Sequence, residues 1–471
     1  MMKKKGKYTV IIFLMLIISL MSSFFIAFDR SKPVEYEYLF ILPMLFSLIC
    51  ISMVPILNRY SSNISIWIIF ILYFIRNVIN PFFMYLGNYS SLFLLSSRVN
   101  INKAIFLMIY ETFMVFLTIN IYINRKKILT IKNRFYRKRQ TKLKVIGLAL
   151  VMLTIFCFLS FMTVPAISGT YNTIFNAESV VSNNYINVNA NVAYGSIQRV
   201  LFTLTLFLIP ILQILLPLTI YIYMKKKYGE NRWCVVLAMI IMFLNFLFIS
   251  DNNIDVFIIT IVLSLMLIKL YPKYSRFICT VIGSVLVLGI VVLIVAKTNT
   301  NMLTSDNPFE AITKFLQAYF QGVNNVAGGF SIVNDSKVKS LFFDFFDMIP
   351  FRNTIFSGIS GDRLVKLYCI SNNVNSQIIP SISQSYYYLS FILAPILPMI
   401  IVTFSIRAFN KSSLTKNVYR SSYYLSNSIY LTFATAVNNF TIYGTTYLNL
   451  ILPLFILSTL AGSEVEIQNT V

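Results

Sequence analysis

Histidine is absent from all 471 residues of the chain. Its absence removes the side chain that most often serves as a general base near neutral pH. A Ser-His-Asp triad, a histidine-ligated zinc ion and a histidine-ligated haem are therefore excluded. The motifs GxxxxGK[ST], GxGxxG, GxSxG and HExxH are also missing, so no nucleotide-binding or hydrolase signature is present.

Charge is scarce as well. Only 12% of the residues are charged, whereas 57% are hydrophobic, and the mean hydropathy is +0.75. A chain this apolar cannot form water-soluble domains, so we predict an all-α polytopic membrane protein. The five cysteines are spread along the chain, and an unclustered set indicates neither a disulfide framework nor a metal site.

Apolar runs long enough to cross a hydrocarbon core recur along the chain and predict about 12 transmembrane helices. The first follows four lysines, as in a signal sequence, but it is too long for one and lacks a small-residue cleavage site, so we expect an uncleaved helix. The runs are 8–28, 39–57, 64–80, 104–123, 145–167, 197–223, 233–250, 254–270, 277–296, 384–406, 422–438 and 443–460.

The connectors between these runs alternate between strongly basic and poor in Lys and Arg. Alternate connectors hold 26 of the 39 Lys and Arg residues, which predicts that they and both termini are cytoplasmic. The formal charge of +23 is then explained by membrane topology, and no nucleic-acid partner is expected.

One connector, 297–383, is long, charge-balanced and on the Lys/Arg-poor, extracytoplasmic side. Asn307 to Glu310 has the form of a capping box with Pro308 at the first helical position, and apolar residues then recur at helical spacing. A second apolar stripe runs from Val338 to Ile349. We expect two short amphipathic helices that lie on the outer interface or pack over the bundle.

The predicted organisation is 1–296 with spans one to nine, 297–383 as a substrate or catalytic cover, and 384–471 with spans ten to twelve and a short cytoplasmic tail.

Arg76 and Glu111 are charged residues inside predicted spans, where charge is costly. Arg76 lies near the outer end of the third span and Glu111 about two turns into the fourth. One interpretation is an ion pair that joins neighbouring helices. The other is that both line a polar, substrate-binding cavity, in which Arg76 faces a phosphate.

Carboxylates on the predicted outer side give two further hypotheses. Asp251 and Asp255 flank a tight turn between the seventh and eighth spans; they either cap a helix and are solvated, or one of them orients or deprotonates an acceptor hydroxyl. Glu35 and Glu37 resemble the acidic metal site of some polyprenyl-phosphate-sugar glycosyltransferases.

Outer-side cations form the last candidate set. Arginine stays charged and offers a planar fork that matches phosphate oxygens, so such arginines can neutralise a diphosphate without a metal ion. The alternative for each is a solvated or snorkelling charge. The candidates are Arg352 and Arg363 as catalytic residues, and Arg199 and Lys366 as substrate-binding residues.

The segment Asn375-Ser376-Gln377-Ile378-Ile379-Pro380, followed by Tyr386-Tyr387-Tyr388 and Ala394-Pro395, resembles Wzy-type polymerases of O-antigen and capsular polysaccharide, particularly those of Gram-positive bacteria. The similarity covers about 300–405 and otherwise the layout of spans. The Arg-x10-Gly pattern of some members is not reproduced, because Pro210 stands eleven residues after Arg199 and Arg363 eleven after Arg352.

The resemblance implies a GT-C-like bundle in the bacterial cytoplasmic membrane that polymerises undecaprenyl-diphosphate-linked repeat units at its outer face. No cofactor and no metal are expected, since the lipid-linked oligosaccharide diphosphate is the substrate. The partners implied are membrane lipid-linked glycans, a flippase and a chain-length regulator. The alternatives are a flippase for the same units and a polyprenyl-phosphate-sugar-dependent glycosyltransferase. An O-antigen ligase is disfavoured, because that family relies on an outer-face histidine, and a non-catalytic scaffold is the least favoured class.

Overall fold

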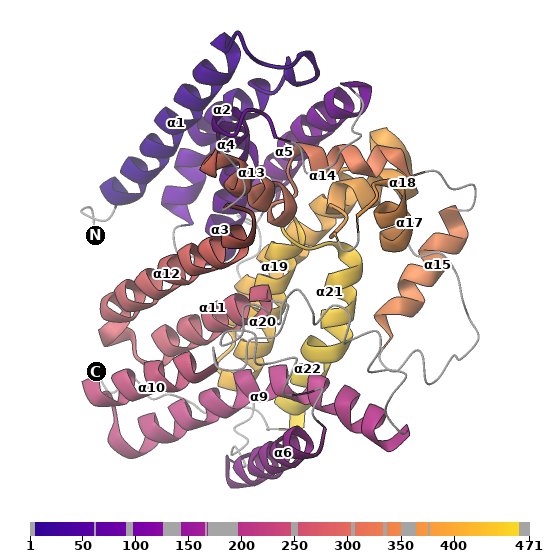
Figure 1. The fold of residues 1–471 in the computed structure, drawn as a ribbon. Coiled ribbons are helices and arrows are strands. Elements are labelled where there is room, and N and C mark those ends of the chain that lie inside the picture. The colour runs from indigo at the N-terminus through magenta and orange to yellow at the C-terminus, as the bar shows by residue number, and fades with distance from the viewer. Residues whose placement is uncertain are drawn as a thin grey trace. The chain divides into compact units, whose positions relative to one another are not determined.

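The computed structural model describes most of the chain, and every regular element in the described part is a helix (Figure 1). This confirms the all-α class. The described residues are 5–60, 63–90, 98–125, 143–164, 167, 196–245, 253–302, 307–332, 337–349, 364–374 and 377–460.

Within these residues, seven helices are long and apolar enough to cross a membrane, or up to nine if each of two sharply bent helix pairs is one span. The chain is therefore a multi-pass membrane protein. All twelve predicted apolar runs overlap described helices, but the count of twelve spans and their orientation stay predictions. The seven are Tyr8–Phe28, Val34–Arg59, Ile64–Leu86, Asn100–Ile123, Ile146–Thr163, Val200–Tyr228 and Phe440–Thr459.

The chain forms two compact units, each built from separate stretches of sequence. Unit 1 comprises Met1–Arg134, Ile294–Asn410 and Ser428–Thr446, and unit 2 comprises Phe135–Leu293, Lys411–Asn427 and Tyr447–Val471. The helices α12 (Ser275–Met302), α19 (Ile396–Leu414) and α20 (Val418–Ala434) contribute residues to both.

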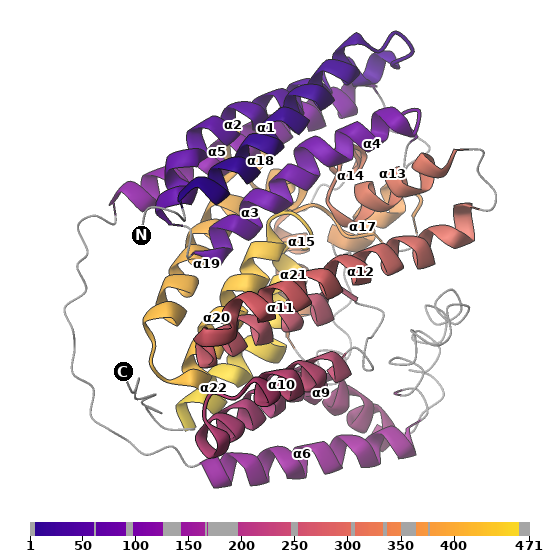
Figure 2. The ribbon, with the colours of Figure 1, turned by 90° about the vertical axis from the view of Figure 1, so that its left-hand side faces the viewer.

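Unit 1 begins with a bundle in which α2 packs against both α1 and α5 (Figure 2). Its core is rich in aromatic rings: the centroid of Phe46 lies 5.2 Å from that of Phe70 and 6.1 Å from that of Phe116. Such edge and tilted ring pairs are favourable beyond the apolar area they bury. The elements are α1 (Lys5–Phe28), η2 (Val34–Tyr36), α2 (Ile41–Arg59), α3 (Ile64–Phe74), η3 (Ile75–Ile79), α4 (Asn80–Leu86) and α5 (Arg98–Arg125).

The predicted connector contributes a second set of helices to unit 1. The two expected amphipathic helices are present as α13 and α15, which pack against α4 and α21 respectively. Between them, all six residues of α14 are buried, so the middle of the connector lies inside unit 1. The helices of the connector are α13 (Pro308–Tyr319), α14 (Val323–Gly328), η7 (Gly329–Ser331), α15 (Lys337–Met348) and α17 (Leu364–Ser371). They pack with α18 (Ser381–Leu393), which begins at the end of the connector, and α21 (Phe440–Thr446), which lies outside it.

The start of α13 differs in one respect from the predicted capping box. Asn307 does cap the helix, because its side-chain oxygen accepts a hydrogen bond from the amide of Phe309 at 3.0 Å. Glu310, however, pairs with Lys314 at 2.6 Å. An opposite charge four residues along the helix offers the carboxylate a stronger partner than the backbone amide of the capping residue.

The tenth predicted span, 384–406, is not one straight helix. The pair Ser381–Leu393 and Ile396–Leu414 is bent by 112°. Ser390 has a φ of 68° inside α18, and Pro395 cannot donate a backbone hydrogen bond to the helix. The Tyr110 hydroxyl donates to the carbonyl of Ile392 at 3.1 Å, so a backbone oxygen near the break gains a partner.

Unit 2 centres on α9, which packs against α6, α10 and α11. Lys269, near the end of α11, donates to the carbonyls of Ser412 and Thr415 and to the Ser421 hydroxyl at 2.8–2.9 Å. A cation at the end of α19 is favourable because the last carbonyls of a helix lack partners. The elements are α6 (Leu143–Thr163), α9 (Ser196–Tyr228), α10 (Arg232–Leu244), α11 (Asn253–Leu270), η6 (Pro272–Tyr274), η8 (Tyr447–Ile451) and α22 (Leu452–Leu460).

A cluster of hydroxyl groups joins three helices of unit 1. Ser405 Oγ lies 2.6 Å from Thr432 Oγ1 and also contacts Ser65 Oγ, and Ser65 Oγ lies 3.0 Å from Thr432 Oγ1. All three side chains are buried. Small polar residues let membrane helices approach closely and bond across the interface, where the apolar effect that drives packing in water is missing.

We expect Ser405→Ala to lower the free energy of unfolding by about 0.6–1.7 kcal/mol, the range measured for interhelical hydrogen bonds in membranes. The measurement is reversible unfolding of the purified protein in mixed micelles. Thr403→Ala is the matched control, because among the described residues the Thr403 hydroxyl bonds within its own helix, to Met399 O at 2.8 Å. Equal losses in both variants contradict a role for the cluster.

Candidate functional site

A π turn in the third span places the first candidate residue. The helix widens at Ile75–Ile79, and Pro81 follows in α4. A proline ring clashes with the carbonyl four residues earlier, here Asn77, and a wider turn relieves that clash. Arg76 and Asn77 are buried within this turn.

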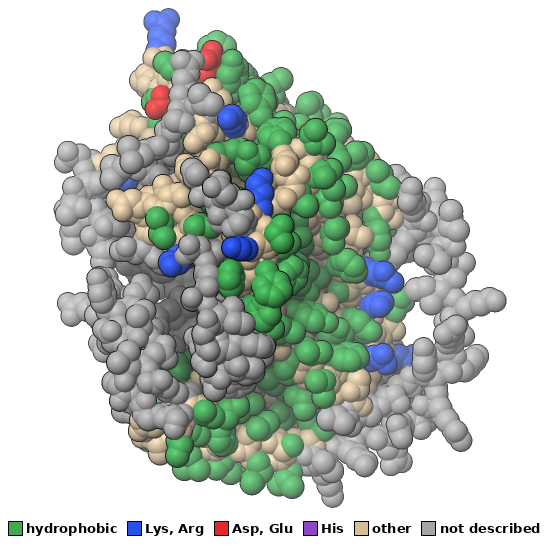
Figure 3. Space-filling model, turned by 90° about the vertical axis from the view of Figure 1, so that its right-hand side faces the viewer, with side chains coloured by type: hydrophobic (Ala, Val, Ile, Leu, Met, Phe, Trp, Pro, Cys, Tyr) green, Lys and Arg blue, Asp and Glu red, His purple; other side chains and the backbone are tan. Residues whose placement is uncertain are grey.

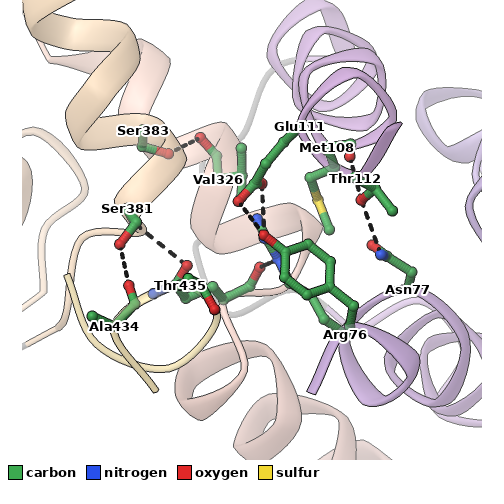
Figure 4. A network of polar contacts seen from close by, with 12 residues as sticks. Arg76, Asn77, Met108, Glu111, Thr112, Val326, Ser381, Ser383, Ala434 and Thr435 are labelled. Carbon is green, nitrogen blue, oxygen red and sulfur yellow. Dashed lines mark hydrogen bonds and ion pairs between the residues drawn. The ribbon is translucent and has the colours of Figure 1, made fainter. Parts of the chain in front are cut away.

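Arg76 and Glu111 form the ion pair that was one of the two interpretations of the sequence. Arg76 Nη1 lies 2.8 Å from Glu111 Oε2, and both side chains have an exposed fraction of 0% (Figure 4). The Tyr73 hydroxyl donates to the other carboxylate oxygen at 3.0 Å. Buried charges are costly unless paired and hydrogen-bonded, so the pair holds α5 against the π turn.

Arg76 also fixes the connector. Its Nε donates to the carbonyl of Gln321 at 3.1 Å, while Nη2 is buried and has no hydrogen-bond partner among the described residues. Gln321 adopts a φ of 49° just after α13. Its side chain accepts from the amide of Ser381 at 3.3 Å and donates to the carbonyl of Asn438. One buried glutamine therefore links the π turn to the start of α18 and to the segment before α21.

Amide side chains extend this network beneath α13 and α14. Gln317 Nε2 donates to Asn80 Oδ1 at 2.7 Å, Gln317 Oε1 accepts from the amide of Asn324 at 3.1 Å, and the Tyr36 hydroxyl donates to Asn324 Oδ1 at 2.8 Å. A Cβ on Gly322 would lie 2.1 Å from Gln317 Oε1 and 2.5 Å from Asn80 Nδ2. Glycine is thus required where the backbone passes these amides.

A second buried carboxylate lies on α15. Asp344 Oδ2 accepts from the Tyr388 hydroxyl at 2.6 Å and from Gln384 and Thr441 at 3.4 Å, and Oδ1 accepts from the amide of Leu364 at 3.2 Å. These donors come from α18, α21 and the first residue of α17. Asp344 therefore joins four helices of unit 1, and it fixes the backbone directly after Arg363.

The helix α17 is tied to α14 as well. The Tyr368 hydroxyl donates to the carbonyl of Asn325 at 2.8 Å, and burial raises the pKa of this tyrosine well above its usual value. The hydroxyl thus stays a neutral donor. Lys366, on the same helix, is exposed.

The candidate residues do not all meet. The structure brings Arg76 and Glu111 together; Asp255 lies in the first turn of α11, in unit 2. Arg199 belongs to α9, but its side chain lies outside the described part, as do Asp251, Arg352 and Arg363 altogether. Substrate binding and catalysis by these residues stay predictions. In the described part of the chain, no three His, Cys, Asp or Glu residues are grouped closely enough to hold a metal ion.

The sequence contained a signal for the amide network that our interpretation did not use. Gln317, Gln321, Asn324 and Asn325 recur at positions i, i+4, i+7 and i+8, which is the spacing of one helical face. Four amides at this spacing inside a membrane protein indicate a buried polar contact, which the structure forms across the break between α13 and α14 and not on one helix. The equivalent signal for Asp344 is its i, i+4 spacing from Ser340 and Met348.

Comparison with known proteins adds no relative: no family model, curated protein or solved structure matches the chain. The sequence and the fold together identify a polytopic all-helical membrane protein.

We expect Arg76→Met to lower the free energy of unfolding by about 3–5 kcal/mol, because Glu111 is left buried without its cation. Arg76→Met combined with Glu111→Leu should recover most of that loss, since it removes both charges. Thermal unfolding in detergent measures the effect.

The matched control is Arg407→Met, at an exposed arginine, for which a change within about 0.5 kcal/mol is expected. A double variant as unstable as Arg76→Met alone shows that the arginine acts through packing or through Gln321, and not through its charge.

Proposed function

We propose that the chain is a metal-independent membrane glycosyltransferase that polymerises undecaprenyl-diphosphate-linked oligosaccharide repeat units at the outer face of the bacterial cytoplasmic membrane. In this proposal twelve helices span the membrane, both termini are cytoplasmic, and 297–383 is extracytoplasmic. The product is a polysaccharide of the capsular or O-antigen type. The partners are the lipid-linked glycans, a flippase and a chain-length regulator.

One observation carries the proposal: the connector is built into unit 1 through buried polar contacts. Gln317, Gln321 and Asn324 each have an exposed fraction of 0%. Arg76 donates a hydrogen bond to the backbone of the connector. A pore or carrier needs little chain outside the bilayer. A connector held this rigidly suits an enzyme, because a bimolecular transfer gains most from fixed positions of both substrates.

In the reaction proposed, a hydroxyl of one lipid-linked unit attacks the anomeric carbon of the glycan on another. The new glycosidic bond forms as the bond from that carbon to the diphosphate breaks, and undecaprenyl diphosphate leaves with the electron pair. Asp251 or Asp255 takes the hydroxyl proton. Arg352 and Arg363 stabilise the charge on the leaving diphosphate, while Arg199 and Lys366 bind the substrate.

In this proposal Arg76 and Glu111 act as structural residues and do not contact the substrate. Because Arg76 is paired and holds the carbonyl of Gln321, it supports the connector that carries Arg352, Arg363 and Lys366. Asp344 supports the same segment at Leu364.

A flippase for the same lipid-linked units is the second candidate. The observation that favours it is that two pairs of consecutive helices are sharply bent, by 116° and 112°. Transporters often bind substrates at broken helices. The same helix α18, however, is held at Ser381 and Gln384 by Gln321 and Asp344 of the connector, so its position also has a structural reason.

Deleting the gene should leave single lipid-linked repeat units at the outer leaflet while long polymer disappears. Two quantities are measured. The first is the share of lipid-linked units that an added, membrane-impermeant glycosidase can digest, which reports the units in the outer leaflet. The second is the length of the polymer. Units that accumulate on the cytoplasmic side instead show a flippase and end the polymerase proposal.

We expect Arg363→Lys and Arg352→Lys to lower polymerisation at normal protein abundance, because lysine keeps the charge but loses the two-point contact with phosphate. Removing a preorganised donor costs on the order of 10²–10³ in rate. Arg420→Lys, at an exposed arginine assigned to the cytoplasm, is the control. Wild-type rate and product length in both Arg→Ala variants remove these arginines from the site.

A further inference from the structure

The helix α15 turns its polar face inward and its apolar face outward, which is the reverse of a helix that faces water. Its inward side carries Ser340, Asp344 and Met348, with exposed fractions of 1%, 2% and 6%. Its outward side carries an apolar stripe, defined by Val338, Leu341, Phe342 and Phe345, with exposed fractions of 80%, 37%, 56% and 49%.

The orientation of α15 is fixed by the contacts of Asp344. Its carboxylate accepts hydrogen bonds from Tyr388, Gln384, Thr441 and the amide of Leu364. Turning the helix to bury the stripe would remove these partners, and a carboxylate deprived of its hydrogen bonds in the interior is costly. The apolar stripe must therefore face whatever surrounds unit 1 at this helix.

The surroundings on this side of unit 1 are apolar. The helix α18, against which α15 packs, itself exposes Leu389, Phe391, Ile392 and Leu393. Hydrophobic side chains also make up most of the described surface on the face drawn in Figure 3. The helices α15 and α18 thus both expose large apolar side chains, as membrane-spanning helices do towards lipid.

Two lysines complete the pattern. Lys337 and Lys339 precede and flank the stripe and are exposed, and Lys337 Nζ lies 5.8 Å from the ring centroid of Tyr387. An apolar face next to lysines is the arrangement by which short amphipathic helices bind an anionic bilayer surface.

We infer that α15 is a membrane-interface helix. Its apolar stripe inserts among the acyl chains, and Lys337 and Lys339 bind anionic phospholipid headgroups. This inference goes beyond the proposed reaction and does not depend on it. It also distinguishes the two amphipathic helices of the connector, since α13 packs against α4 with Thr313 and Gln317 bonded to it, whereas α15 turns its apolar stripe outward.

A second copy of the chain fits the stripe less well. The helix has 12 residues and is about 18 Å long at a rise of about 1.5 Å per residue. Four side chains along that length offer a few hundred Å² at most, whereas a stable interface needs roughly 800 Å² from each partner.

The test is photo-crosslinking of the full-length protein in nanodiscs that contain phosphatidylglycerol and phosphatidylcholine. Benzoylphenylalanine replaces Phe342 or, separately, Phe345, and adducts are identified by mass spectrometry. The matched control is benzoylphenylalanine at Phe330, which is half-buried and packs on Tyr386 with ring centroids 4.6 Å apart. Phospholipid adducts at Phe342 and Phe345, at least about tenfold above the control, are expected if the stripe lies in lipid.

The headgroup assignment is tested in the same discs. Each of Lys337→Gln and Lys339→Gln should lower the share of phosphatidylglycerol among the adducts about fivefold, equivalent to about 1 kcal/mol per lysine at an anionic surface. An unchanged share overturns the role of the lysines.

Two results overturn the membrane-interface helix itself. Protein–protein adducts of twice the chain mass show that a second copy covers the stripe, and folded protein without lipid adducts shows that it faces water. Labelling of the unsubstituted protein by a lipid-soluble diazirine gives an independent measurement. Labels on the residues of the stripe are expected, and labelling of α1 is the internal control. If α1 is labelled and the stripe is not, the inference is wrong, and this result does not depend on whether the benzoylphenylalanine variants fold.

Discussion

The buried ion pair between Arg76 and Glu111 is the constraint on which unit 1 depends. Two charges with no exposure to solvent are tolerated only if each finds its partners, and the partners come from elements far apart in the sequence. Glu111 holds α5, while the guanidinium holds both the π turn and, through Nε, the carbonyl of Gln321. The position of the connector inside the unit follows from that third contact.

Hydrogen bonds between amide and hydroxyl side chains also join the helices of unit 1. Gln317 donates to Asn80 and accepts from the amide of Asn324. The hydroxyls of Ser65, Ser405 and Thr432 join three helix segments. In a membrane the apolar effect does not drive helices together, so association relies on close packing and on such bonds. The polar contacts are therefore structural whatever chemistry the connector performs.

Proline shapes the places where helices depart from regular geometry. A π turn precedes Pro81 in unit 1, and another, Tyr447–Ile451, precedes Pro453 in unit 2. In each, an asparagine stands four residues before the proline, and the side-chain oxygens of Asn77 and Asn449 are both buried without a hydrogen-bond partner in the described residues. The recurrence fits a single cause, which is the clash of a proline ring with the carbonyl one turn earlier.

The sequence by itself determined the helical class, the multi-pass membrane character and the two short helices of the connector, including the Asn307 cap. These features depend on hydrophobicity, spacing and capping within a few residues, and such properties are local. The tertiary structure decided how polar residues pair across the chain. Arg76 meets a carbonyl 245 residues away, α18 breaks at Ser390, and Asp344 turns inward while Phe342 and Phe345 turn outward. Those outcomes are set by which distant segments pack together, because a buried charge or amide takes the partner that the folded chain brings within bonding distance.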